Sequence, residues 1–252
     1  MNVTPPPRGA QAALRAIRLL KAFTPDRPEQ SLGDLSARLG LNKSTAHRLL
    51  AALESESLVE RDPERGTYRL GAGTVALGVQ ALAGSDLRSR VHPVLERLAA
   101  LSGETATLEV LVEDNVVILD EVEGRHMVGT GGHTGTRWAA HATSTGKAIL
   151  AAVTEEWPVP AESTLPAFTA QTMTSPERLS EGLAAVRRRG YATAVDELEE
   201  GFTGVAAAFC DPDGRVRGAL SLSGPTSRLT VRRRAELGRL LAAEAQALSG
   251  MA

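Results

Sequence analysis

The sequence predicts an α+β protein of two domains, the first mainly helical and the second a mixture of helices and strands. Apolar residues recur with helical spacing through most of the first 83 residues, whereas strand-like segments alternate with helices after residue 104. Charge divides in the same way: the first 71 residues carry 11 basic and 8 acidic side chains (+3), and the remainder carries 17 and 22 (−5). The overall charge of −2 is therefore the sum of a basic head and an acidic body.

Composition excludes several classes of protein. The chain has 252 residues, 42% of them hydrophobic, which is enough for packed cores. It has no run of about 18 apolar residues and no hydrophobic stretch near its start, so we expect neither a membrane span nor a secretory signal. A single cysteine, Cys210, excludes a disulfide framework, a thiolate zinc site and an iron–sulfur cluster. We expect a cytoplasmic protein without a metal or cofactor.

The first predicted domain covers residues 10–71, behind a proline-rich lead-in over 1–9 that we expect to be disordered. Its expected elements are a helix over 10–23, a helix that Ser31 caps and Gly40 ends, a helix over 43–56 behind Asn42, and strands over 58–61 and 67–70 joined by a turn over 62–66. Three helices followed by a hairpin are the order of a winged helix-turn-helix, a DNA-binding fold.

The start of the third helix carries side chains suited to DNA. Its polar donors lie away from the apolar face of the helix and are Lys43, Ser44, Thr45, His47 and Arg48. A recognition helix presents such residues to the major groove, so we expect double-stranded DNA as the partner, with lysine and arginine at phosphates and the other three at base edges. The alternative is the ordinary basic surface of a small helical domain.

The hairpin adds positive charge beside this helix. Arg61, Arg65 and Arg69 lie on its two strands and turn, and neighbouring acidic residues partly offset them. We expect these arginines to contact phosphates, as the wing of such a domain does.

The second predicted domain covers residues 86–252 and follows a helical linker over 72–85. Its expected elements are a helix over 86–102, strands over 105–112 and 115–122, a glycine-rich loop over 124–135, a helix over 144–152, an irregular connection over 157–174, a helix over 175–190, strands over 191–195, 204–210 and 216–223, and a helix over 230–248.

Distinctive motifs lie in both predicted domains. Lys43-Ser-Thr-Ala-His-Arg-Leu-Leu is followed by Gly66-x-Tyr-x-Leu-Gly, and later by Gly135-Thr-Arg-Trp-Ala-Ala-His-Ala-Thr-Ser-Thr-Gly-Lys-Ala and Ala219-Leu-Ser-Leu-Ser-Gly-Pro. Together with shorter matches over about residues 10–249, these motifs resemble the IclR family of bacterial transcriptional regulators. At Ser57 that family usually has glycine, and we expect the exchange to have a minor effect.

The resemblance implies a winged helix-turn-helix joined to a GAF-like effector-binding domain, assembled as a homodimer or a dimer of dimers. It implies a sequence-specific repressor of transcription whose operator binding responds to a small organic acid or aromatic metabolite. Carried over position by position, the implied effector contacts are Trp138, Ser144, Thr145, Ala194, Gly204, Ser221 and Ser223. The two serines at 221 and 223 share one face of a strand, although ordinary small polar positions would have the same spacing.

Two of these positions depart from the relatives that bind small acids. Those relatives have aspartate at Ala194 and cysteine at Gly204, so this chain loses a carboxylate and a thiol, which removes polar contacts and enlarges the site. Trp138 occupies a variable position of the pocket loop. We therefore expect an effector that is larger or more apolar than a two- or three-carbon acid.

Two other functions are compatible with parts of the sequence. Ser144-Thr-Gly-Lys147 matches Ser-x-x-Lys, in which lysine activates a serine nucleophile one helical turn away in an acyl-transfer hydrolase. The partner motifs Ser-Asp-Asn and Lys-Thr-Gly are absent, so we expect no enzyme and no catalytic residue. The second alternative is an interaction module whose GAF-like domain only dimerises.

Overall fold

The computed structural model describes residues 10–24, 27–83, 86–126, 133–153 and 165–249. The predicted lead-in over 1–9 lies outside these residues, as do parts of the glycine-rich loop and of the connection before residue 174. The chain divides into two compact units, Met1–Gly84 and Ser85–Ala252, and the division falls within the predicted linker. Among the helices in the described ranges, none is both long and apolar enough to cross a bilayer.

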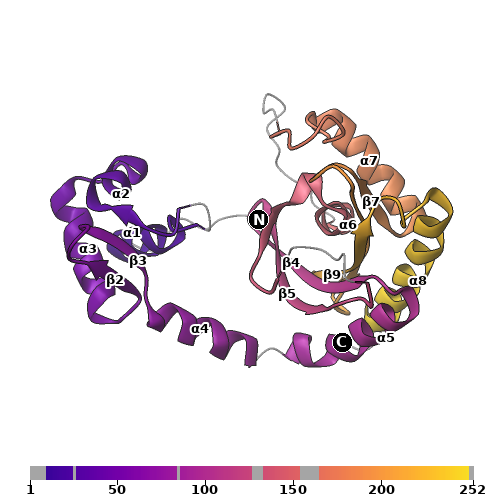
Figure 1. Cartoon of the computed structure of the whole chain (residues 1–252), viewed down its shortest axis with the longest axis horizontal. Helices are drawn as coiled ribbons and strands as arrows, with labels where there is room; N and C mark the ends of the chain where they lie inside the picture. Colours follow the sequence, from indigo (N-terminus) through magenta and orange to yellow (C-terminus); the bar gives the residue numbers. More distant parts are fainter. Residues whose placement is uncertain (1–9, 25–26, 84–85, 127–132, 154–164, 250–252) are drawn as a thin grey trace. The chain divides into compact units, whose positions relative to one another are not determined.

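The first unit combines helices with a small antiparallel sheet (Figure 1). Its elements are α1 (Gln11–Lys21), β1 (Gln30–Ser31), α2 (Leu32–Leu39), α3 (Lys43–Ser55), β2 (Val59–Asp62), β3 (Thr67–Leu70) and α4 (Ala72–Ala83). The strand order is β1-β3-β2. The winged helix-turn-helix prediction is confirmed. The prediction omitted β1, because this strand has two residues and exists through its pairing with β3.

Local hydrogen bonds set where α2 and α3 begin. The Ser31 hydroxyl accepts the Asp34 N–H at 3.2 Å, and the Asp34 carboxylate accepts the Ser31 N–H, which makes a capping box. Gly40 ends α2 in the left-handed region at φ +62°, and the Asn42 side chain then accepts the Thr45 N–H at 2.8 Å. The tight turn before α3 is therefore encoded by residues within the turn itself.

The end of α3 uses a backbone conformation that favours glycine. Ser57 has φ +58°, and the N–H groups of Ser57 and Leu58 each donate at 2.9 Å to the carbonyls of Glu54 and Leu53. A residue with a Cβ pays a steric cost in this region, whereas glycine does not. This geometry explains why a glycine is usual at this position. It also means that the serine lowers the stability of the folded chain here.

The second unit is built on one antiparallel sheet of six strands in the order β6-β5-β4-β9-β8-β7. Its elements are α5 (Asp86–Ser102), β4 (Thr105–Val112), β5 (Asn115–Val122), β6 (Arg137–Ala139), a 3-10 turn η1 (Ala140–Ala142), α6 (Ser144–Ala152), α7 (Pro176–Arg189), β7 (Ala192–Val195), β8 (Phe202–Cys210), β9 (Val216–Pro225) and α8 (Val231–Ser249). The α+β class with two domains is confirmed. Strand β6 was missed, because three residues after a glycine-rich loop carry no period of their own.

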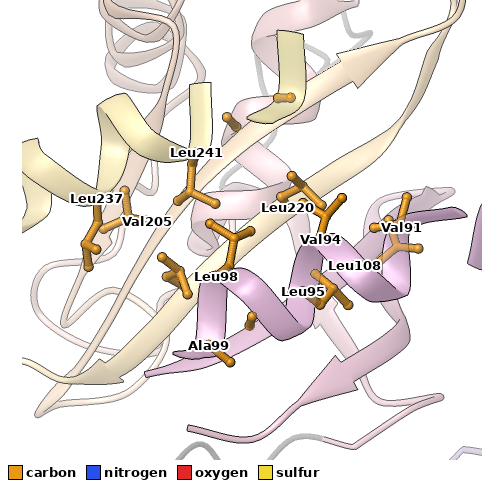
Figure 2. Close-up of a cluster of buried hydrophobic side chains, with 14 of the residues drawn as sticks. Val91, Val94, Leu95, Leu98, Ala99, Leu108, Val205, Leu220, Leu237 and Leu241 are labelled. Carbon is orange, nitrogen blue, oxygen red and sulfur yellow. The ribbon is translucent and has the colours of Figure 1, made fainter. Parts of the chain in front are cut away.

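One face of the sheet forms the main core of this unit. Leu108, Val205 and Leu220 point from β4, β8 and β9 toward α5 and α8, where Leu95 and Leu241 are fully buried (Figure 2). These strand positions alternate with residues on the opposite face, as the pleat requires. These three large apolar side chains therefore lie on one face of the sheet.

The opposite face carries α6 and α7 over part of its area and polar residues over the rest. Figure 1 shows α6 beside α7 and β7, and Ile149 and Leu183 pack there in a second apolar cluster with Ala206 and Ala219. On the same side of β4, Thr107 and Glu109 are both buried. Buried polar side chains require hydrogen-bond partners, and their arrangement defines the site described next.

Candidate functional site

The first unit presents the predicted DNA contacts on the start of α3. Lys43, Ser44, His47 and Arg48 are exposed and Thr45 is half-buried. Ala46 and Leu50 on the same helix have no exposed surface and pack into the unit's core. The helix therefore separates its polar donors from its apolar face within its first two turns, as a helix that enters the major groove must.

The hairpin arginines have weak surface partners. The Arg69 guanidinium lies 2.9 Å from Glu60, Arg65 lies 3.5 Å from Glu29, and Arg61 lies over the Tyr68 ring at 6.0 Å. Exposed ion pairs of this kind contribute little to stability, about 0–1 kcal/mol, so a phosphate can replace the carboxylate at small cost. Breaking these ion pairs to contact DNA would therefore cost the hairpin little stability.

The second unit contains a cavity of about 220 Å³ on the polar face of its sheet. All seven residues carried over as effector contacts line it: Trp138, Ser144, Thr145, Ala194, Gly204, Ser221 and Ser223. They come from β6, α6, β7, β8 and β9, so residues as far apart in sequence as Trp138 and Ser223 line one space.

Strand register explains how four of these residues meet. Ser223 lies opposite Gly204 across the β8–β9 pair, and Gly204 lies opposite Ala194 across the β7–β8 pair. Ser221 lies two residues along β9 on the same face. The three strands therefore present a continuous row of small residues, which leaves room above the sheet.

Glycines allow α6 to approach this face closely. A Cβ on Gly146 would collide with the backbone of Ala140 in η1, and a Cβ on Gly204 would come within 2.6 Å of the Ser144 hydroxyl oxygen. The missing side chain at Gly204 therefore makes room for Ser144 as well as for a ligand. This finding changes the expectation that the position simply enlarges the site.

A buried carboxyl group that the sequence analysis did not select lies in the cavity wall. Glu109 Oε1 accepts the Thr107 hydroxyl at 2.8 Å and Oε2 accepts the Thr145 hydroxyl at 2.6 Å. Burial raises the pKa of Glu109, and the two hydroxyl hydrogen bonds oppose that rise. The sequence did contain a signal for this residue: in the strand over 105–112, Thr105, Thr107 and Glu109 alternate with apolar residues, which places a carboxyl group on the polar face of the strand.

Lys147 does not act on Ser144 in the way a hydrolase would require. Its ammonium group lies 2.6 Å from Glu197 Oε1, and both side chains are buried. Burial lowers the pKa of Lys147, and the Glu197 carboxylate opposes this shift. The lysine is thus part of a buried ion pair, while Ser144 faces the cavity. The arrangement of Lys147 gives the acyl-transfer alternative no support.

A winged helix-turn-helix joined to a separate α/β unit with an internal cavity defines a DNA-binding transcriptional regulator. Two family models match the chain, the IclR helix-turn-helix domain over residues 12–63 and the bacterial transcriptional regulator IclR C-terminal domain over 79–250. The chain belongs to the IclR family.

Named relatives and solved structures extend over nearly the full chain. The transcriptional repressor IclR of Escherichia coli strain K12 is 33% identical over 235 residues, covering 92% of this chain and 86% of that protein. The repressor AllR of the same strain is 32% identical over 244 residues, covering 96% and 90%. An IclR regulator from Alicyclobacillus acidocaldarius superposes with a TM-score of 0.76 at 28% identity, covering 94% and 98%.

A further solved structure contains a small molecule. It is an IclR homologue from Microbacterium hydrocarbonoxydans complexed with 4-hydroxybenzoate, with a TM-score of 0.71 and 30% identity, covering 96% of this chain and 100% of that one.

Proposed function

We propose that this chain is a transcriptional repressor whose affinity for its operator is controlled by a small organic molecule held in the cavity of the second unit. The observation that carries the proposal is that the seven carried-over contact residues line one cavity. The names of the relatives support repression, and the 4-hydroxybenzoate complex supports a small organic ligand.

On DNA, the first unit reads and holds the duplex through α3 and the hairpin. Ser44, Thr45 and His47 contact base edges, while Lys43, Arg48 and the three hairpin arginines contact phosphates. The repressor is a homodimer or a dimer of dimers. Its winged units then occupy half-sites spaced by about 34 Å, one helical turn of DNA, or a multiple of that distance.

In the cavity, the ligand is an aromatic metabolite or another organic molecule larger than a two- or three-carbon acid. Trp138 and Phe202 provide apolar area and the hydroxyls of the sheet provide polar contacts, which is the usual composition of a small-molecule site. Control of DNA binding requires that the ligand have different affinities for the DNA-competent and DNA-incompetent states.

The test begins with operator fragments selected from genomic DNA by the purified chain. Fluorescence anisotropy then measures the operator Kd with and without candidate ligands, 4-hydroxybenzoate among them. We expect an effector to change the operator Kd by about fivefold or more. Trp138→Ala should weaken this response, whereas Phe168→Ala, which removes an exposed ring that does not line the cavity, should preserve it. Ligand binding with an unchanged operator Kd would contradict the proposal.

A further inference from the structure

A buried ion pair joins the first turn of α6 to the connection between β7 and β8. The Lys147 ammonium group lies 2.6 Å from Glu197 Oε1, and 3% and 8% of the two side chains are exposed. Neither residue lines the cavity. Glu197 belongs to residues 196–201, which we call the wall segment because Leu198 and Glu199 within it do line the cavity. The pair therefore connects two elements that each form part of the cavity wall.

Stability alone does not account for this pair. The desolvation of two buried charges often costs as much as their attraction returns, and an apolar pair of similar volume is often equally stable. Here the buried Glu197 Oε2 has no hydrogen-bond partner within the described residues, so the carboxylate is incompletely satisfied. Burial also lowers the pKa of Lys147 and so disfavours its charged form. What the pair does supply is direction, because a charge-assisted hydrogen bond fixes how its two partners lie.

Hydrogen bonds close the wall segment into a loop. The Asp196 N–H donates to the Phe202 carbonyl at 2.9 Å, and the Asp196 carboxylate accepts the Gly201 N–H at 2.8 Å. These bonds join the two ends of the segment to each other. The bond from Lys147 to Glu197 is of a different kind, since it connects the loop to α6.

The α6 end of this connection is itself held firmly. Gly146, the residue before Lys147, packs so closely on the backbone of Ala140 that a Cβ would collide with it. The same turn of the helix places Ser144 and Thr145 in the cavity wall. Lys147 therefore extends from a fixed element of the cavity to a loop that lines another part of the same cavity.

We propose that Lys147 and Glu197 are positioning residues for the effector: their ion pair holds the wall segment against α6 in the conformation that binds the ligand. Neither side chain touches the ligand. This role rests on the function proposed above, since it requires an effector in the cavity. The pair acts by preorganisation, because a wall segment that is already in place need not be ordered when the ligand binds. A segment that occupied its binding conformation for a tenth of the time would raise the apparent Kd about tenfold.

Substitutions at the pair separate positioning from folding. Lys147→Met and Glu197→Gln each leave one buried partner without its counter-charge, so both should lower the melting temperature. The double variant, Lys147→Met with Glu197→Leu, replaces the pair with apolar side chains and should melt close to wild type, while it lacks the directional bond. Arg232→Met is the matched control, because it breaks an exposed ion pair with Glu236 outside the cavity.

Amide hydrogen exchange without ligand tests whether the pair holds the wall segment. Exchange of residues 196–202 in the double variant should be about tenfold faster than in wild type, while α5 and β9 in the main core keep their wild-type rates. Arg232→Met should leave residues 196–202 unchanged. Equal rates in wild type and the double variant would overturn the proposal. Faster exchange spread evenly over the whole second unit would overturn it too, since the pair would then only stabilise the fold.

Ligand affinity tests the consequence, with 4-hydroxybenzoate as the probe. Isothermal titration should give the double variant a Kd about tenfold above wild type and Arg232→Met a Kd within about twofold. An unchanged Kd in a double variant whose wall segment exchanges faster would overturn the role in ligand binding.

Operator anisotropy on the wild-type protein separates this role from the function proposed above. If 4-hydroxybenzoate binds more weakly to the double variant but leaves the wild-type operator Kd unchanged, ligand control of DNA binding is contradicted and the positioning role stands. If the ligand shifts the operator Kd equally in wild type and the double variant, with equal exchange rates, ligand control stands and the positioning role is contradicted.

Discussion

The two units of this chain place their functional side chains in opposite ways. On α3 the residues proposed to contact DNA are near neighbours in sequence, from Lys43 to Arg48, and most are exposed. In the second unit the cavity residues are separated by more than 110 positions, from Thr107 to Ser223, and most are buried. The first arrangement is created by one helix and its cap, whereas the second needs every strand of the sheet in register.

The difference has an energetic consequence. An exposed side chain such as that of Lys43 or Arg48 contributes little to the free energy of unfolding and can be substituted without loss of the fold. A cavity residue such as Glu109 or Gly204 is part of the packing, so its function and the stability of its unit are coupled. Four experiments test how sharply the two units differ in this respect, taken from the largest expected effect to the smallest.

The largest effect is expected at Gly146, where α6 meets η1. Gly146→Ala places a Cβ against the backbone of Ala140, which has no flexible side chain to move aside, so we expect a loss of about 3 kcal/mol or more of unfolding free energy. Denaturant unfolding measures it. Gly78→Ala in α4 meets nothing within 4 Å and should be neutral or stabilise by up to about 1 kcal/mol. Equal effects at the two glycines would remove the contrast between the units.

The next effect is a pH dependence at Glu109. The pKa of Glu109 in the folded chain is raised above the ordinary value of 4.5. At a pH below 4.5 the carboxyl group is protonated in the folded and in the unfolded chain, so its burial does not lower the free energy of unfolding through ionisation. As the pH rises from 4.5 toward the raised pKa, wild-type stability should fall relative to Glu109→Gln, by about 1.4 kcal/mol for each pH unit, and then level off.

Denaturant midpoints of both proteins across that pH range supply the measurement. Parallel pH profiles would show that Glu109 ionises as readily in the folded chain as in the unfolded one. The same denaturant midpoints are measured for His47→Gln, which changes an exposed side chain on α3 outside the cavity.

A smaller effect is expected on DNA binding. Arg48→Ala should weaken binding to all sequences and flatten the dependence of log K on log salt concentration by about one unit, if Arg48 contacts one phosphate. The melting temperature should stay close to wild type because the side chain is exposed. Loss of discrimination at one base pair with an unchanged salt slope would instead assign Arg48 to base recognition.

The smallest effect is expected at the end of α3. Ser57→Gly relieves a left-handed conformation at φ +58° but gives the unfolded chain more freedom, so the net gain should be up to about 1 kcal/mol. Unfolding of the first unit, followed by denaturant titration, measures it. Ser55→Gly, at the last residue of α3, is the matched control and should destabilise. A loss of stability at Ser57 would show that its side chain does more than occupy the turn.

Much of the fold could be predicted because its signals are local. The capping box at Ser31, the left-handed Gly40 and the Asn42 cap lie within a few residues of the helix ends that they set. The strands over 105–112 and 115–122 were placed exactly, since alternation and an intervening turn define both ends. Strands β1 and β6 were missed because each is short and exists through pairing with a distant partner.

The cavity could be predicted only in part. Its serines, Trp138 and the start of α6 came from resemblance to a family, and the structure brings them to one space. Glu109 has no such precedent in the motifs, and its meaning depends on Thr107, Thr145 and Ser221 arriving from other elements. A buried carboxyl cannot be told from an exposed one until those partners are known.

The sequence by itself determined the class of protein, the two-domain order and the position of the helix proposed to contact DNA, because period, caps and charge act over a few residues. Tertiary structure decided that Ser144, Gly204 and Ser223 share a cavity, that Lys147 pairs with Glu197, and that Glu109 lines this cavity. The physical reason is that electrostatics and packing depend on distance in space. Distance in space is set by strand register across the whole sheet, which no local pattern contains.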